Sequence, residues 1–74
     1  MSTLEIMDRT GDTKLIWSAD QQAEVDAAKT TFDSLKAKGY VAYSVGTDGS
    51  TGEVIKSFDP NAERIIMRPA MQGG

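Results

Sequence analysis

The sequence predicts one α+β domain in which a single helix covers a mixed sheet, and three observations lead to this fold class. Residues 18–39 carry apolar side chains at helical spacing, whereas the segments on either side alternate apolar and polar residues as strands do. The 74-residue length leaves room for one small core. The composition, 39% apolar and 26% charged, is that of an ordinary folded protein.

Two strands are expected before the helix. Residues 4–9 (LEIMDR) place leucine and isoleucine on one face and glutamate, methionine and arginine on the other, which is the period of a half-buried strand. Within 10–13 (TGDT), Gly11 and Asp12 are expected to form a tight reversal. Residues 14–19 (KLIWSA) then return as the second strand, and the two form a hairpin.

The helix is predicted over 18–39. Ser18 or Asp20 is expected to cap its first turn, with Gln21 three residues after Ser18 in a capping-box arrangement. Gly39 is placed to end the helix in a left-handed conformation. Charged residues of both signs occupy the outer face. The residues that form one apolar stripe along the helix are Val25, Ala28, Phe32 and Leu35.

Three further strands are expected after the helix. Residues 40–45 resume strand alternation, and the glycine-rich residues 46–52 form a connection. Residues 53–58 are the fourth strand, and 59–63, which contain Asp-Pro-Asn, form a turn. The last strand is predicted at 64–68.

The last strand is expected to be central in the sheet. Ile65, Ile66 and Met67 are consecutive and apolar, which predicts burial on both faces. With the order strand, strand, helix, strand, short strand, strand, this predicts a β-grasp arrangement, in which the last strand pairs in parallel with the first. An antiparallel meander, in which the third, fourth and fifth strands fold back on one another, is the alternative that the sequence leaves open.

Composition excludes several classes of function. The net charge of -3 with scattered lysines and arginines argues against nucleic-acid binding. Without cysteine or histidine, the chain lacks the usual residues of thiol, triad or zinc chemistry. Asp8 and Asp12 lack a third ligand for a cation. No signal peptide and no apolar run of roughly 18 residues is present. We expect a cytoplasmic monomer that is not an enzyme and binds no metal, cofactor, nucleic acid or membrane.

The aromatic residues and the glycine-rich loop each have two interpretations. Trp17 is either an exposed anchor for a partner or, as we favour, part of the core. Tyr40 and Tyr43 are three residues apart on a strand, so they lie on opposite faces, one in the core and one at the surface. Residues 48–52 (DGSTG) are a flexible connection rather than a phosphate loop, because no lysine or helix follows at the required spacing.

The stretch after the last strand, PAMQGG, differs from the rest. Pro69 has no amide proton and is expected to mark the point where the chain leaves the sheet. Residues 70–74 reach at most about 17 Å when extended. Gly73 and Gly74 lack a Cβ atom and therefore suit a narrow channel.

In its length, its order of elements and its Gly73-Gly74 ending, the chain resembles a ubiquitin-like modifier. The resemblance implies a β-grasp domain over 1–69 and a flexible tail over 70–74. It implies that the Gly74 carboxylate is activated with ATP by a partner adenylating enzyme. The chain departs from ubiquitin at Gln72, where ubiquitin has an arginine, and at Pro69, which interrupts the tail.

The resemblance also implies the partners and the contact residues. The activated tail would pass to a target lysine through a conjugating enzyme and be removed by a deconjugating protease, or it would accept sulfide and form a thiocarboxylate, as sulfur carriers do. Gly73 and Gly74 are the residues activated, and Arg68, Met71 and Gln72 are the expected contacts to the partner. A non-covalent adaptor, encoded by a phage or within an operon and with an incidental tail, is the remaining alternative.

Overall fold

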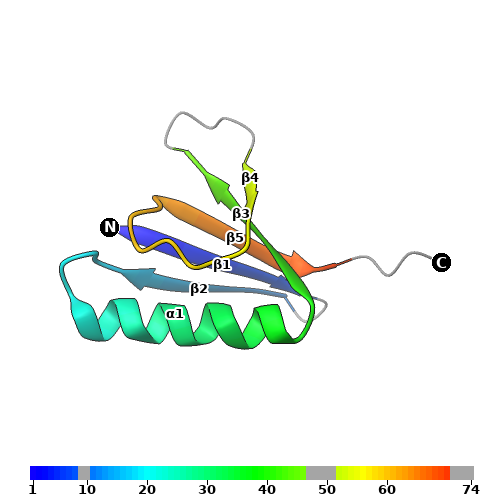
Figure 1. The fold of residues 1–74 in the computed structure, drawn as a ribbon, viewed down its shortest axis with the longest axis horizontal. Coiled ribbons are helices and arrows are strands. Elements are labelled where there is room, and N and C mark those ends of the chain that lie inside the picture. Colours follow the sequence, from blue (N-terminus) through cyan, green and yellow to red (C-terminus); the bar gives the residue numbers. More distant parts are fainter. Residues whose placement is uncertain (9–10, 47–51, 71–74) are drawn as a thin grey trace.

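The computed structural model describes residues 1–8, 11–46 and 52–70, where one helix packs on one face of a mixed sheet (Figure 1). The predicted α+β class is confirmed. The sheet order is β2-β1-β5-β3-β4. The elements are β1 (Ser2–Asp8), β2 (Gly11–Trp17), α1 (Gln22–Ala37), β3 (Tyr40–Val45), β4 (Glu53–Ile55) and β5 (Arg64–Pro69).

The last strand, β5, lies in the middle of the sheet. It pairs in parallel with β1, where Leu4 is opposite Ile65, and antiparallel with β3, where Ala42 is opposite Met67. This order matches the β-grasp arrangement, and the meander is wrong because β5 lies between β1 and β3 rather than beside β4. The predicted burial on both faces is wrong for Ile66, which is only half-buried, because the helix covers one face and leaves the other open.

The core lies between the helix and the covered face of the sheet. The predicted apolar stripe of the helix is confirmed, with Leu35 partly buried at its end. The buried apolar residues are Leu4, Ile6, Trp17, Val25, Ala28, Phe32, Ala42, Ala62, Ile65 and Met67.

An aromatic cluster joins the chain before β5 to this core. Trp17 is fully buried, as favoured, and its Nε1–H donates to the carbonyl of Pro60 at 3.0 Å. The Phe58 ring lies 5.1 Å from that of Trp17 and 5.7 Å from that of Phe32. The fourth strand therefore ends at Ile55 and not at Phe58, because Phe58 turns inward to the cluster instead of continuing the pairing with β3.

The helix begins later than predicted. Gln21 is the N-cap and makes no side-chain capping bond, so the prediction of a Ser18 or Asp20 cap is wrong. The Gln21 N–H donates to the Ser18 carbonyl in a turn that separates Ser18 from the first helical turn. The Ser18 N–H donates instead to the Glu24 carboxylate at 2.8 Å. At the other end the prediction is confirmed, since Gly39 has a φ of +97°, which L residues with a side chain rarely adopt.

The β1–β2 hairpin is confirmed, but its reversal lies elsewhere. Gly11 is paired with Asp8, and Asp12 is paired with Met7, so both belong to β2 rather than to the turn. The connecting residues 9 and 10 lie outside the described residues.

One carboxylate is buried on the open face of the sheet. The Glu5 side chain on β1 is only 11% exposed, and the Nε–H of Arg64 on β5 donates to it at 2.7 Å. The Lys14 ammonium on β2 lies 3.5 Å from the other Glu5 oxygen. A charge taken from water requires such partners. The sequence placed Glu5 on the solvent side of β1, and these cross-strand partners are what bury it.

At Gly52, immediately before β4, the backbone lies close to β3. A Cβ atom at this position would lie 2.8 Å from the carbonyl oxygen of Ser44 and 3.1 Å from a methyl carbon of Val45. The first contact is with backbone, which cannot rotate away as a side chain can. Any side chain at position 52 therefore has to separate the two strands.

Replacing Glu5→Gln should lower the free energy of unfolding by about 1–3 kcal/mol, because the charge that Arg64 and Lys14 contact is lost while the side-chain shape remains. Urea unfolding followed by Trp17 fluorescence measures the change. Asp20→Asn removes an exposed carboxylate and is the matched control. Equal midpoints for the two variants would contradict the role given to Glu5.

Replacing Gly52→Ala should destabilise the fold by about 1–3 kcal/mol, because the added methyl group meets the Ser44 backbone. Amide hydrogen exchange should show the loss first in β3 and β4, with β1 and β2 less affected. Ser57→Ala, at an exposed position, serves as the control. Unchanged protection of the β3 amides would show that the strands separate without cost.

Candidate functional site

Strand β5 carries the chain toward the predicted tail. Pro69 is paired with Tyr40, and the N–H of Ala70 donates to the Gly39 carbonyl at 3.3 Å. Hydrogen bonding to the sheet region thus continues one residue past the departure point predicted at Pro69, because proline lacks only its own N–H. Of the predicted tail contacts, Met71 and Gln72 lie outside the described residues, as do Gly73 and Gly74. The four residues after Ala70 span at most about 14 Å.

Arg68, the remaining predicted contact, lies on the open face of the sheet and forms a pair with Tyr43. Its Cζ atom is 5.2 Å from the centre of the Tyr43 ring. A cation over an aromatic face is attracted by the ring's electron density. Tyr40 packs instead against the core on the helix side, so the prediction of opposite faces for the two tyrosines is confirmed.

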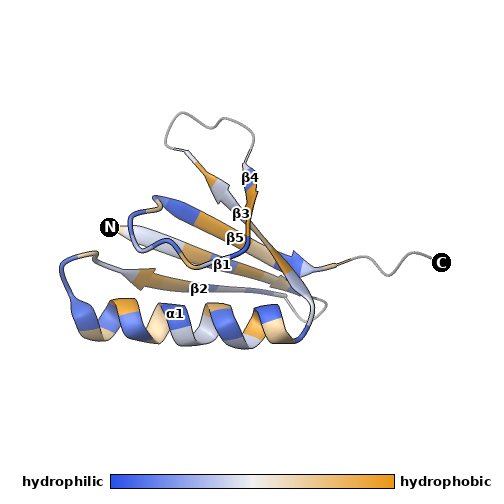
Figure 2. Ribbon diagram, in the orientation of Figure 1, coloured by the Kyte–Doolittle hydropathy of each residue, from blue (hydrophilic) through white to orange (hydrophobic). Residues whose placement is uncertain are grey.

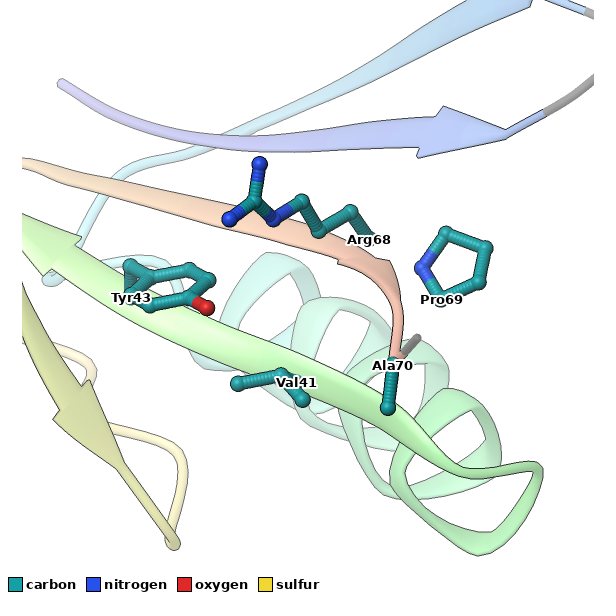
Figure 3. Close-up of a pocket in the computed structure, with 5 residues that line it drawn as sticks. All are labelled: Val41, Tyr43, Arg68, Pro69 and Ala70. Carbon is teal, nitrogen blue, oxygen red and sulfur yellow. The ribbon is translucent and has the colours of Figure 1, made fainter. Parts of the chain in front are cut away.

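A hollow of about 360 Å³ lies where β3 and β5 approach the tail (Figure 3). Figure 3 shows Arg68 and the Tyr43 ring on the same side of the sheet, with α1 behind it. The residues that line the hollow are Val41, Tyr43, Arg68, Pro69 and Ala70. Its volume is several times the ~30 Å³ of a water molecule, which is enough for a partner's side chain.

A second hollow, of about 340 Å³, lies on the other side of the Arg68–Tyr43 pair. Both residues line it too, so the pair separates two neighbouring depressions. The residues that line this second hollow are Met7, Tyr43, Val45, Gly52, Ile66 and Arg68.

The open face combines apolar and charged residues. Ile16 on β2 is 57% exposed and Val54 on β4, which is paired with Tyr43, is 60% exposed. Figure 2 shows apolar residues along the central strands of the sheet and alternating polar and apolar residues along the helix. Such a face is suited to contact with another molecule.

The described residues offer little else for chemistry. No group of three or more acidic residues that could hold a metal ion occurs within 1–8, 11–46 and 52–70. In these same ranges no helix has the length and apolarity that a bilayer span requires. Four of the five residues of the glycine-rich stretch 48–52 lie outside the described part, so its interpretation as a flexible connection stays a prediction.

The sequence pointed to Arg68 as a tail contact but did not predict its partner. The pairing depends on the β3–β5 register, which places Val41 opposite Arg68 and Tyr43 opposite Ile66. Sequence alternation alone could have placed Tyr43 on the open face, but not beside a particular residue of another strand. No protein-family model, curated protein or solved structure matches this chain.

Proposed function

We propose that the chain is a ubiquitin-like modifier whose Gly74 carboxylate is activated by a partner adenylating enzyme and transferred to an amine of a target protein. The observation that carries the proposal is the central position of β5, which is parallel to β1 and is followed by the sequence AMQGG. A central strand is held on both sides, so the fold supplies a rigid base for a short tail. A terminal carboxylate on such a base can enter a partner's active site while the domain stays outside.

The chemistry belongs to the partners. A carboxylate is a poor electrophile at neutral pH. In the adenylating enzyme a Gly74 carboxylate oxygen would attack the α-phosphate of ATP and release pyrophosphate. A partner's thiolate would attack the acyl carbon of this adenylate and release AMP. A target lysine amine would then attack the resulting thioester, forming an isopeptide bond and releasing the thiol. This chain contains no cysteine and no histidine, so it enters these steps as the substrate.

The proposal assigns distinct roles along the end of the chain. Gly73 and Gly74 allow close approach to the nucleotide because they have no side chains. Met71 and Gln72, with Arg68 at the base, contact the channel wall. The carboxylate of Gly74 must be free, whether as translated or after a protease has released it. A deconjugating protease would recognise the same segment.

Two alternatives make use of the same scaffold. In a sulfur carrier, sulfide displaces AMP from the same adenylate and leaves a thiocarboxylate at Gly74. In a non-covalent adaptor, the tail takes no part in chemistry and the two hollows of the open face supply the binding surface. The sulfur carrier shares the adenylation step with the proposed modifier, whereas the adaptor requires no adenylation.

The activation step is tested by ATP–pyrophosphate exchange with the candidate adenylating enzyme, sought among neighbouring genes. Exchange should require the full chain and fall to background when Gly73 and Gly74 are deleted, since the carboxylate then no longer reaches the nucleotide. Trp17 fluorescence should show an unchanged unfolding midpoint for the deletion variant. Absence of exchange with the full chain contradicts the proposal and favours the adaptor.

The fate of the activated tail is read by mass spectrometry. Trypsin does not cleave before proline, so Arg68 is protected by Pro69 and the last cleavage follows Arg64. A target lysine should therefore carry the remnant IIMRPAMQGG. A free chain in which one oxygen is replaced by sulfur would identify the sulfur carrier instead.

A further inference from the structure

Arg68 is a cation of the open face, and none of the ion pairs among the described residues includes it. Lys14 and Arg64 on the same face both contact Glu5. No carboxylate of the described residues contacts the Arg68 guanidinium. A planar guanidinium presents paired N–H donors that match the two oxygens of a carboxylate.

Tyr43 holds this guanidinium in place. The Arg68 Cζ atom lies 5.2 Å from the centre of the Tyr43 ring, and this contact orients the guanidinium over the sheet (Figure 3). The Arg68 side chain remains exposed. An arginine that is already oriented loses less conformational entropy when it binds. Tyr43 is therefore a positioning residue for Arg68 and also lines both hollows.

The two hollows define the shape of the ligand. Each is lined mainly by apolar side chains, and Arg68 and Tyr43 lie between them. In an extended peptide, residues i, i+2 and i+4 point to the same side and follow one another at about 6.8 Å. This alternation allows an apolar side chain in each hollow and a carboxylate between them, at Arg68, because Arg68 lines both hollows.

We propose that this site, formed by Arg68, Tyr43 and the two hollows, binds an extended segment of a partner protein with the pattern apolar-x-acidic-x-apolar. The charge favours a single carboxylate over a polyanion. Arg68 supplies a single positive charge between the two hollows, and the net charge of -3 opposes nucleic acid. The site shares Arg68 with the tail contacts proposed above, but binding of such a segment does not require activation of Gly74.

The test uses the full chain labelled with ¹⁵N and the probe acetyl-Leu-Ser-Glu-Ser-Leu-amide. Titration should shift the amide resonances of β3 and β5 around Tyr43 and Arg68, and leave those of the helix unchanged. The matched peptide with glutamine in place of glutamate should bind about tenfold more weakly, because the hydrogen bond to a charged group is lost.

Arg68→Gln should weaken binding of the glutamate peptide about tenfold and abolish its advantage over the glutamine peptide. Arg68 is exposed, so the variant should fold as the parent does. Arg68→Lys should recover part of the affinity, because it keeps the charge without the planar fork. Tyr43→Phe should bind as the parent does, since the ring that positions Arg68 remains.

Lys29→Gln is the matched control, with the same change in charge on the outer face of the helix. The Lys29 ammonium donates to Asp33 at 2.7 Å, and this hydrogen bond raises the pKa of Lys29. The affinity of the Lys29→Gln variant for the glutamate peptide should equal that of the parent chain. Equal affinity for the two peptides, shifts that map to the helix, or no shifts at all would overturn the proposal. So would stronger competition by a single-stranded oligonucleotide, or self-association through this face.

Discussion

The parallel pairing of β1 with β5 is the constraint on which the rest of the structure depends. Two parallel neighbouring strands cannot be joined by a tight turn. The residues between β1 and β5 must therefore bring the chain back to the middle of the sheet. The helix, β3 and β4 form this return path. The segment before β5 is held by the hydrogen bond from Trp17 to the Pro60 carbonyl and by the packing of Phe58 on Trp17. From this central position β5 places Ile65 and Met67, both fully buried, in the core.

Alternation along β5 divides the strand between stability and recognition. Ile65 and Met67 face the helix and are fully buried, whereas Arg68 projects to the open face. A shift of the register by one residue would exchange the two sets, placing Arg68 in the core. The ion pairs of Glu5 cross from β1 to β2 and to β5, so they favour this register on the face where no core packing enforces it.

Much of this fold could be predicted from the sequence, because periodicity and glycine placement are local signals. The apolar stripe of the helix, the left-handed Gly39 and the central β5 follow from residues close in the chain. The helix cap and the hairpin reversal were misplaced locally, by a few residues, whereas two other errors depend on distant partners. Phe58 leaves the expected fourth strand because its ring packs against the rings of Trp17 and Phe32. Glu5 is buried because Arg64 donates a hydrogen bond to its carboxylate. The Arg68–Tyr43 pair likewise requires a register that composition does not encode.

The base of the tail and the open face meet at the same place, and this bears on how the two proposals relate. Ala70 lines the first hollow, and its N–H donates to the Gly39 carbonyl. A partner segment seated against Arg68 and Tyr43 would therefore lie beside the point where the tail begins. Binding there would hold the domain in one orientation while leaving the residues after Ala70 free to enter an active site. Recognition would then use Arg68 and Tyr43 on the sheet, whereas the chemistry would use the Gly74 carboxylate, and Arg68 is the residue that both proposals share.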